Sequence, residues 1–247
     1  PEIPLDVAVK EKRRYQLTGN VAIIPIHGPM MKAESKFGGV GTQGVRKMIR
    51  EAKTDYEVRT ILLHIDSPGG HVSGTQELAD EVYSVRQVPG KHILAHIEDL
   101  GASAAYWVAS QAERITANMT AEIGSIGTVA VLTDNSARLE RLGVRVHVIA
   151  TGKYKGVGTE GVSISGEDLS YIRTRVESLN EHFQTSILRG RKLSLVQLAQ
   201  MSDGRVHIAT QAKAMGFIDA IMSFEEAVEE AQNLSIRDIK MPSPVRQ

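Results

Sequence analysis

Ser103 is the first residue whose setting could support catalysis. It follows the apolar run His92–Ile97 and the pair Gly101-Ala102, and it precedes the Ala-rich segment Ala104–Ala112. A serine between a strand and a helix places its hydroxyl beside the N–H of Ala104, at the positive end of the helix dipole. That setting suits a nucleophile whose reaction intermediate carries an oxyanion. Taken alone, however, Ser103 fits an ordinary helix N-cap better.

A second candidate segment is Ser67-Pro68-Gly69-Gly70. Two glycines directly after an apolar run let the backbone turn sharply and expose its N–H groups. Gly69 and Gly70 could therefore donate to an oxyanion or hold an extended substrate. The same letters also fit a plain strand-to-helix turn, so this segment alone does not indicate catalysis.

A serine nucleophile needs a general base. Of the eight histidines, His71 follows the glycine pair and is kept as a candidate, whereas most others lie in strand patterns that favour structural roles. Lys153 and Lys155 lie in the Gly-rich segment after another apolar run. A lysine serves as a base only where burial or a dipole lowers its pKa, and solvated loop lysines are the structural alternative.

Apolar runs and helical stripes alternate along most of the chain. We predict these strands: Val21–Ile26, Arg59–Ile65, His92–Ile97, Arg114–Ala117, Thr128–Leu132 and Arg145–Ile149. We predict these helices: Val45–Thr54, Thr75–Val85, Ala104–Ala112, Ser136–Leu142, Glu167–Leu188, Ser194–Met201 and one near Phe224–Gln232. Met30–Gly44 and Gly152–Gly166 are expected to be loops.

This alternation predicts an α/β fold with a mostly parallel, buried sheet. Sites in such folds form at the carboxyl ends of the strands. Three segments meet that condition: Asp66–Gly70, Asp99–Ser103 and Gly152–Lys155.

Composition narrows the class of protein further. The 247 residues include no cysteine, which excludes disulfides, a Cys-ligated zinc ion and a cysteine nucleophile. Lys+Arg and Asp+Glu both number 29, so no overall charge drives the chain towards nucleic acid or anionic membranes. With 42% hydrophobic residues and no apolar run of membrane-spanning length, the sequence is typical of a globular protein.

Five segments in order resemble the S49 peptidase family, which contains signal peptide peptidase A proteins and the capsid-maturation proteases of tailed phages. The segments are Asp66–Gly70, Gly101–Ser110, Ile123–Thr128, Gly152–Lys155, and a closing stretch from Gly204–Val206 through Gln211–Asp219. The likeness covers roughly Val21–Ala220. One departure is Ser103-Ala104-Ala105 where the family often has Ser-Gly-Gly; small residues still permit close packing there.

The resemblance implies a Ser–Lys dyad. Ser103 matches the nucleophile, Lys155 the general base, and Ser125 an accessory serine that orients the lysine. Gly69 or Gly70, together with the N–H of Ala104, would form the oxyanion hole, and His71 stays a minor candidate for substrate binding. No metal or organic cofactor is expected, and activity should rise with pH as Lys155 loses its proton.

The family also implies a ClpP/crotonase-type fold of repeated ββα units. We expect an arm over residues 1–18, the peptidase-like domain over 19–232 and a tail over 233–247. The expected partners are a peptide or protein substrate and further copies of the chain in a ring or dome with shared active sites. Neither nucleic-acid binding nor membrane association is indicated.

Two origins and two other functions stay open. The chain could be a phage or prophage capsid-assembly protease in the host cytoplasm, or a trimmed signal peptide peptidase, membrane-anchored with an exported catalytic domain. Alternatively, it could be a crotonase-type acyl-CoA enzyme, or a non-catalytic ring scaffold of the same fold.

Overall fold

The computed structural model describes residues 13–34 and 38–240. These residues form two compact units, the first within Pro1–Ile126 and Ser186–Gln247 and the second over Gly127–Thr185. Most of the predicted arm, three residues of the predicted loop Met30–Gly44, and residues 241–247 lie outside the described residues.

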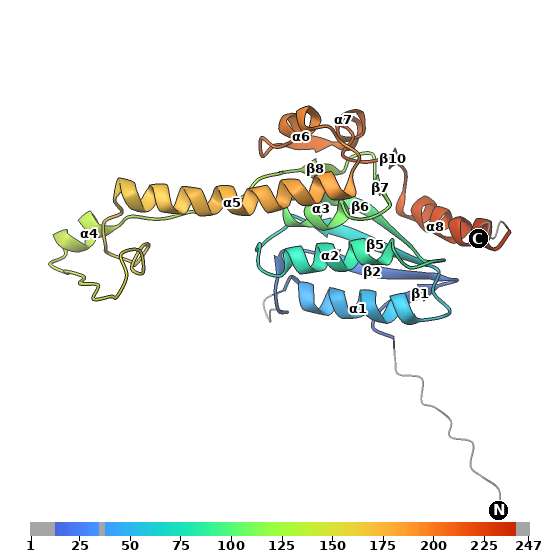
Figure 1. The fold of residues 1–247 in the computed structure, drawn as a ribbon, viewed down its shortest axis with the longest axis horizontal. Helices are drawn as coiled ribbons and strands as arrows, with labels where there is room; N and C mark the ends of the chain where they lie inside the picture. Colours follow the sequence, from blue (N-terminus) through green and yellow to red (C-terminus); the bar gives the residue numbers. More distant parts are fainter. Residues whose placement is uncertain (1–12, 35–37, 241–247) are drawn as a thin grey trace, which may run out of the picture. The chain divides into compact units, whose positions relative to one another are not determined.

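The first unit holds all the described strands (Figure 1). The strands are β1 (Gln16–Thr18), β2 (Val21–His27), β3 (Met30–Met31), β4 (Val40–Gly41), β5 (Thr60–Ser67), β6 (His92–Ala102), β7 (Arg114–Ala117), β8 (Glu122–Gly124), β9 (Val206–Ile208) and β10 (Ala220–Ile221). Its helices are α1 (Thr42–Thr54), α2 (Thr75–Val85), α3 (Ala104–Ala109), α6 (Leu195–Met201), α7 (Ala209–Met215) and α8 (Phe224–Lys240).

The main sheet follows the order β1-β2-β5-β6-β7-β10. All its pairings are parallel except that of β1 with β2. The long strand β6 pairs first with β7 and then, over its last residues, with β8, which in turn pairs antiparallel with β9. The α/β fold with a mostly parallel sheet is therefore confirmed.

Helices cover both faces of this sheet (Figure 1). Side chains alternate between faces along a strand. One set, Val21, Ile23, Leu62 and Leu94, forms a buried cluster with Ala231 of α8, to which Phe224 and Val228 are added. The alternate residues, such as Ile24, Ile61 and Leu63, are also buried and project from the other face. The helices α1, α2 and α3 contact the strands of the sheet as well.

A partly buried ion pair holds the carboxyl-terminal part of the first unit. Arg191 donates two hydrogen bonds of 2.8 Å to Asp219, whose Oδ2 also accepts the Ile115 N–H at 2.7 Å. Burial alone would raise the pKa of Asp219, but the hydrogen bonds from Arg191 and Ile115 outweigh it and lower this pKa below its usual 3.8.

The second unit contains α4 (Ser136–Arg141) and most of α5 (Gly166–Gly190), which ends in the first unit. Residues 127–185 are all described, and they include no strand. The predicted strands Thr128–Leu132 and Arg145–Ile149 are therefore wrong. Their apolar alternation is real, yet a strand forms only where a partner supplies hydrogen bonds, and Val131 and Ile149 are almost fully exposed.

Three further elements have boundaries that differ from the predicted ones. The strand predicted to end at Ile97 continues to Ala102, because β8 pairs with Leu100, Gly101 and Ala102. The predicted loop Met30–Gly44 contains the short pair β3–β4 and the start of α1. The final helix is predicted to end near Gln232 but reaches Lys240.

Within the described residues, none of the helices combines the length and the apolarity needed to cross a bilayer.

Candidate active site

Ser103 lies on a strained turn between β6 and α3. Its backbone has φ 53° and ψ −122°, a conformation that side-chain-bearing residues adopt at a cost of about 1–3 kcal/mol. The turn is fixed on both sides, since the Ser103 N–H donates to Gly124 O at 2.8 Å and Ser103 O accepts from the Trp107 N–H at 2.9 Å. Ser103 itself stays half-buried while Ala102 and Ala104 are buried. Such strain at a strand-to-helix turn is the geometry of a nucleophile elbow.

Gly69 packs directly against this turn. Its φ is +84°, and a Cβ built on it would lie 2.6 Å from both Ala102 O and Ala104 N and 2.8 Å from the Ser103 Cβ. Only glycine fits this approach and this backbone region. The glycine pair predicted from the sequence thus lies beside the predicted nucleophile.

Ser125 lies at the end of the neighbouring strand. In the register of β6 with β8, Ala102 pairs with Gly124, so Ser103 and Ser125 follow paired residues. Ser125 also has a positive φ, of 50°, and its N–H donates to Arg205 O at 2.7 Å. Among the described residues, Ser103 and Ser125 are the two non-glycine residues with positive φ. The strain is therefore concentrated at two adjacent strand ends.

The N–H groups around Ser103 differ in their hydrogen bonding. The Gly69 N–H donates to Ser67 Oγ at 3.1 Å, and that hydroxyl donates to Gly28 O at 2.6 Å. The N–H groups of Gly70 and Ala104 have no hydrogen-bond partner among the described residues. The Ala104 N–H is one of the donors that the start of a helix leaves unpaired.

Met30 occupies one edge of the glycine segment. The Met30 N–H donates to Gly69 O at 2.8 Å, and the His71 N–H donates to Met30 O at 2.9 Å. In this parallel bridge the N–H and C=O of Gly70 point away from Met30. His71 itself is exposed.

The two candidate lysines lie in the second unit and differ in their contacts. Lys153 forms an ion pair with Glu167, and the Tyr154 hydroxyl donates to the same carboxylate at 2.7 Å. The hydrogen bond to Glu167 raises the pKa of Lys153 above its usual 10.5, which disfavours the neutral form that a base needs. Lys155 is exposed, and its side chain has no hydrogen bond or ion pair with any described residue.

The structure thus brings together Ser103, Ser125, Gly69, Gly70 and Ala104 within the first unit. Lys155 belongs to the second unit, so its pairing with Ser103 stays a prediction. Sequence reasoning assigned no role to Ser67, whose hydroxyl holds the glycine turn, or to Arg205, whose carbonyl holds Ser125. Both residues lie in motifs noted in the sequence, Ser67–Gly70 and Gly204–Val206. Hydrogen bonds between segments that are distant in the sequence, however, cannot be predicted from the motifs alone.

The described residues thus form a mostly parallel α/β sheet with a serine on a strained turn, beside two N–H groups that lack a described partner. A serine on a strained strand-to-helix turn is also found in α/β hydrolases. The sequence pattern of peptidase family S49 matches residues 86–236. The chain therefore belongs to peptidase family S49.

Three relatives are similar in sequence to this chain over most of its length. Protease 4 of Haemophilus influenzae is 26% identical over 221 residues, which cover 89% of this chain and 35% of that protein. Capsid assembly protease C of Escherichia phage lambda is 27% identical over 227 residues, 90% of this chain and 51% of the phage protein. Putative signal peptide peptidase SppA of Enterococcus faecium is 26% identical over 187 residues, 76% and 54% of the two chains. The chain spans about a third to about half the length of these relatives.

Proposed function

We propose that this chain is a serine endopeptidase in which Ser103 is the nucleophile and Lys155 the general base. The observation that carries the proposal is the strained, half-buried Ser103, held against Gly69 beside Ser125. A structural N-cap needs no such strain. Membership of a peptidase family supports the choice of reaction.

In the proposed mechanism, Ser103 Oγ attacks a peptide carbonyl while neutral Lys155 Nζ takes the hydroxyl proton. The tetrahedral intermediate collapses, the C–N bond breaks, and Lys155 returns the proton to the leaving amine. Water then attacks the acyl-enzyme, again with Lys155 as base, and releases the acid product and Ser103. Ser125 would act as a positioning residue for Lys155.

We assign the oxyanion donors to the N–H groups of Gly70 and Ala104. The Gly69 N–H is already bonded to Ser67, whereas the other two have no described partner. One donor of this kind is typically worth about 2.7–4 kcal/mol in the transition state. Gly69 would then serve by its close approach to Ser103 and not as a donor.

An extended peptide would bind along the glycine segment by strand addition. Met30 takes the edge formed by Gly69 and His71, so the substrate backbone would pair with the opposite edge, where Gly70 presents its N–H and C=O. A polypeptide is therefore the substrate class that we propose.

We further propose that copies of the chain assemble and complete one another's sites. Residues 128–149 of the second unit contain strand-like apolar alternation without strand partners, and Val129, Val131 and Ile149 are 84%, 87% and 98% exposed. A strand pattern with free edges favours pairing with another chain. Capsid assembly protease C, a relative, is named for an assembly process.

Cleavage of an unfolded protein tests the nucleophile. The Ser103→Ala variant should lose activity to background and should no longer be labelled by a fluorophosphonate. The Ser170→Ala variant removes an exposed serine of α5 and should behave as wild type. Wild-type turnover by Ser103→Ala would overturn the proposal.

A further inference from the structure

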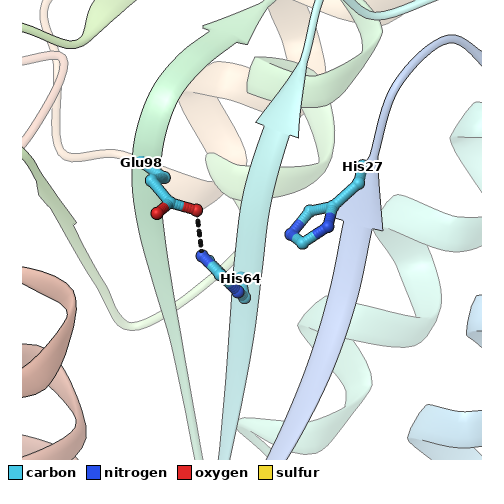
Figure 2. Close-up of side chains that lie close together, drawn as sticks. All are labelled: His27, His64 and Glu98. Atoms are coloured by element: carbon cyan, nitrogen blue, oxygen red, sulfur yellow. Dashed lines mark hydrogen bonds and ion pairs between the residues drawn. The ribbon is translucent and has the colours of Figure 1, made fainter.

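Three side chains with metal-ligand atoms lie together on the sheet, outside the site described above. His27, His64 and Glu98 place one ligand atom each within 4.8 Å of one another (Figure 2). They come from three adjacent strands: His27 ends β2, His64 lies in β5, and Glu98 lies in β6.

Strand register explains why they meet. Pro25 of β2 pairs with His64, and His64 pairs with His96 of β6. Because side chains two residues apart share a face, His27 and Glu98 project from the same face as His64 and are its diagonal neighbours. Figure 2 shows the three side chains on one side of the strands.

His64 is held in a fixed orientation. Its Nε2 lies 2.6 Å from Glu98 Oε2, and its ring stacks on Phe224 of α8 with centroids 4.1 Å apart. The His27 ring meets it edge-on at 4.6 Å. The His64 side chain is 14% exposed and the Glu98 side chain 41%, and His27 is also exposed, so an ion from solvent could reach the cluster.

We propose that His27, His64 and Glu98 form a binding site for a divalent transition-metal ion of the zinc type. Two imidazoles and one carboxylate are a ligand set used by open zinc sites, where water completes the coordination. Bonds of about 2.1 Å in a tetrahedron require ligand atoms about 3.4 Å apart. His64 Nε2 and Glu98 Oε2, now 2.6 Å apart, would separate to this distance as the ion replaces their hydrogen bond. A rotation of the exposed His27 ring would bring its nitrogen to the same distance from within 4.8 Å.

Other histidines on the same face lack this arrangement. The buried His96 already uses both ring nitrogens, since Nδ1 lies 2.9 Å from Thr116 Oγ1 and Nε2 lies 3.2 Å from Asn118 Oδ1. His92 Nδ1 lies 2.9 Å from Glu113 Oε2, so this pair offers one imidazole and one carboxylate. No second imidazole joins that pair among the described residues. The His92–Glu113 pair therefore provides a matched control.

An ion here would tie three strands together near their carboxyl ends. Beyond His64, β5 leads into Ser67 and Gly69, and beyond Glu98, β6 leads into Ser103. The ion would thus hold the strands that carry the strained turn. This proposal does not depend on the peptidase activity, since it concerns binding alone.

Equilibrium dialysis of the whole chain with zinc chloride tests the site. One ion per chain should bind, and thermal unfolding should shift to higher temperature in its presence. His27→Ala should weaken binding at least about 10–100-fold, because even outer-shell changes in metal sites typically cost that much. Glu98→Gln, which keeps the side-chain shape, should weaken it similarly, while His92→Ala should bind as wild type.

Cobalt(II) provides an independent measurement on the same variants. Wild type should show visible absorption bands of a low-coordinate site, and His27→Ala should lose them while its circular dichroism stays unchanged. Equal zinc affinity in wild type and His27→Ala would overturn the proposal. So would an equal loss in His92→Ala, or no stoichiometric binding to wild type.

Discussion

The two units of this chain differ in how much of their structure is packed and hydrogen-bonded. The first has a mostly parallel sheet, buried on both faces, and a strained serine whose turn is hydrogen-bonded on both sides. The second has no strand, and from residues 127–185 only Phe183 is among the buried apolar side chains. One half of the proposed site is thus preformed within a packed core, whereas Lys155 lies on a segment with few buried contacts. The difference teaches that the strained turn of Ser103 is formed by folding of the first unit, and we propose that Lys155 is positioned by assembly.

The largest effect on stability should come from the ion pair that holds the first unit. Asp219→Ala leaves the Arg191 guanidinium, only 10% exposed, without its carboxylate. Breaking such a pair should lower the free energy of unfolding by about 3 kcal/mol. Urea denaturation checks this value. A change below about 0.5 kcal/mol would show that the core of the first unit does not depend on this pair.

Gly69→Ala should damage catalysis more than stability. A Cβ there meets Ala102 O, Ala104 N and the Ser103 Cβ at under 3 Å, so the turn must shift. The shift would displace the Ala104 N–H, a proposed oxyanion donor, and because loss of one such donor typically costs about 10²–10³-fold in kcat, we expect a loss of that size. The control is Gly166→Ala, because nothing lies within 4 Å of a Cβ at Gly166. Equal activity of the two variants would refute the close approach.

Ile149→Asp should disturb assembly and leave the stability of the chain almost unchanged. Its side chain is 98% exposed, so the free energy of unfolding should change by less than about 0.5 kcal/mol. If assembly uses this segment, light scattering should report smaller particles, and activity should fall with them. Tyr56→Asp alters a 77% exposed side chain of the first unit and should leave particle size unchanged. Unchanged size in Ile149→Asp would remove this segment from the proposed interface.

The smallest effect concerns acid stability. The pKa of Asp219 is lower in the folded chain than its usual 3.8, so the unfolded chain binds more protons as the pH falls past that value. The stability that Asp219 contributes is therefore present above pH 3.8 and is lost as the pH falls through the folded-state pKa. Unfolding curves of wild type and Asp219→Asn should converge in this acidic range. A constant difference between them would exclude the carboxylate as the titrating group.

Much of the fold follows from periodicity in the sequence. Thr75–Val85 and Arg114–Ala117 match α2 and β7 to the residue, because their patterns are bounded by clear breaks. The extension of β6 to Ala102 could not be foreseen, since it depends on pairing with β8, a three-residue strand without a sequence signal of its own. Arg145–Ile149 has a strand pattern but lacks a partner, and the pattern alone could not reveal that.

The members of the candidate site were chosen from the sequence, and their catalytic roles stay predictions, whereas the geometry that brings Ser103, Ser125 and Gly69 together could not be predicted. The order of the motifs selected Ser103, Ser125 and the glycine pair. Their meeting depends on the register of Ala102 with Gly124 and on the backbone of Gly69. The positive φ of both serines is imposed by tertiary hydrogen bonds, which no local preference of serine would indicate. The contact of Lys153 with Glu167 likewise separates two lysines that look alike in the sequence.

The rate of fluorophosphonate labelling of Ser103, measured in Lys155→Ala and Lys153→Ala, tests the central claim most directly. The account predicts at least about a 10²-fold slower reaction in Lys155→Ala, the size of a general-base contribution. Lys153→Ala should react within about twofold of wild type, because the Glu167 ion pair raises the pKa of Lys153 and disfavours the neutral form. Wild-type labelling of Lys155→Ala would contradict the Ser–Lys dyad.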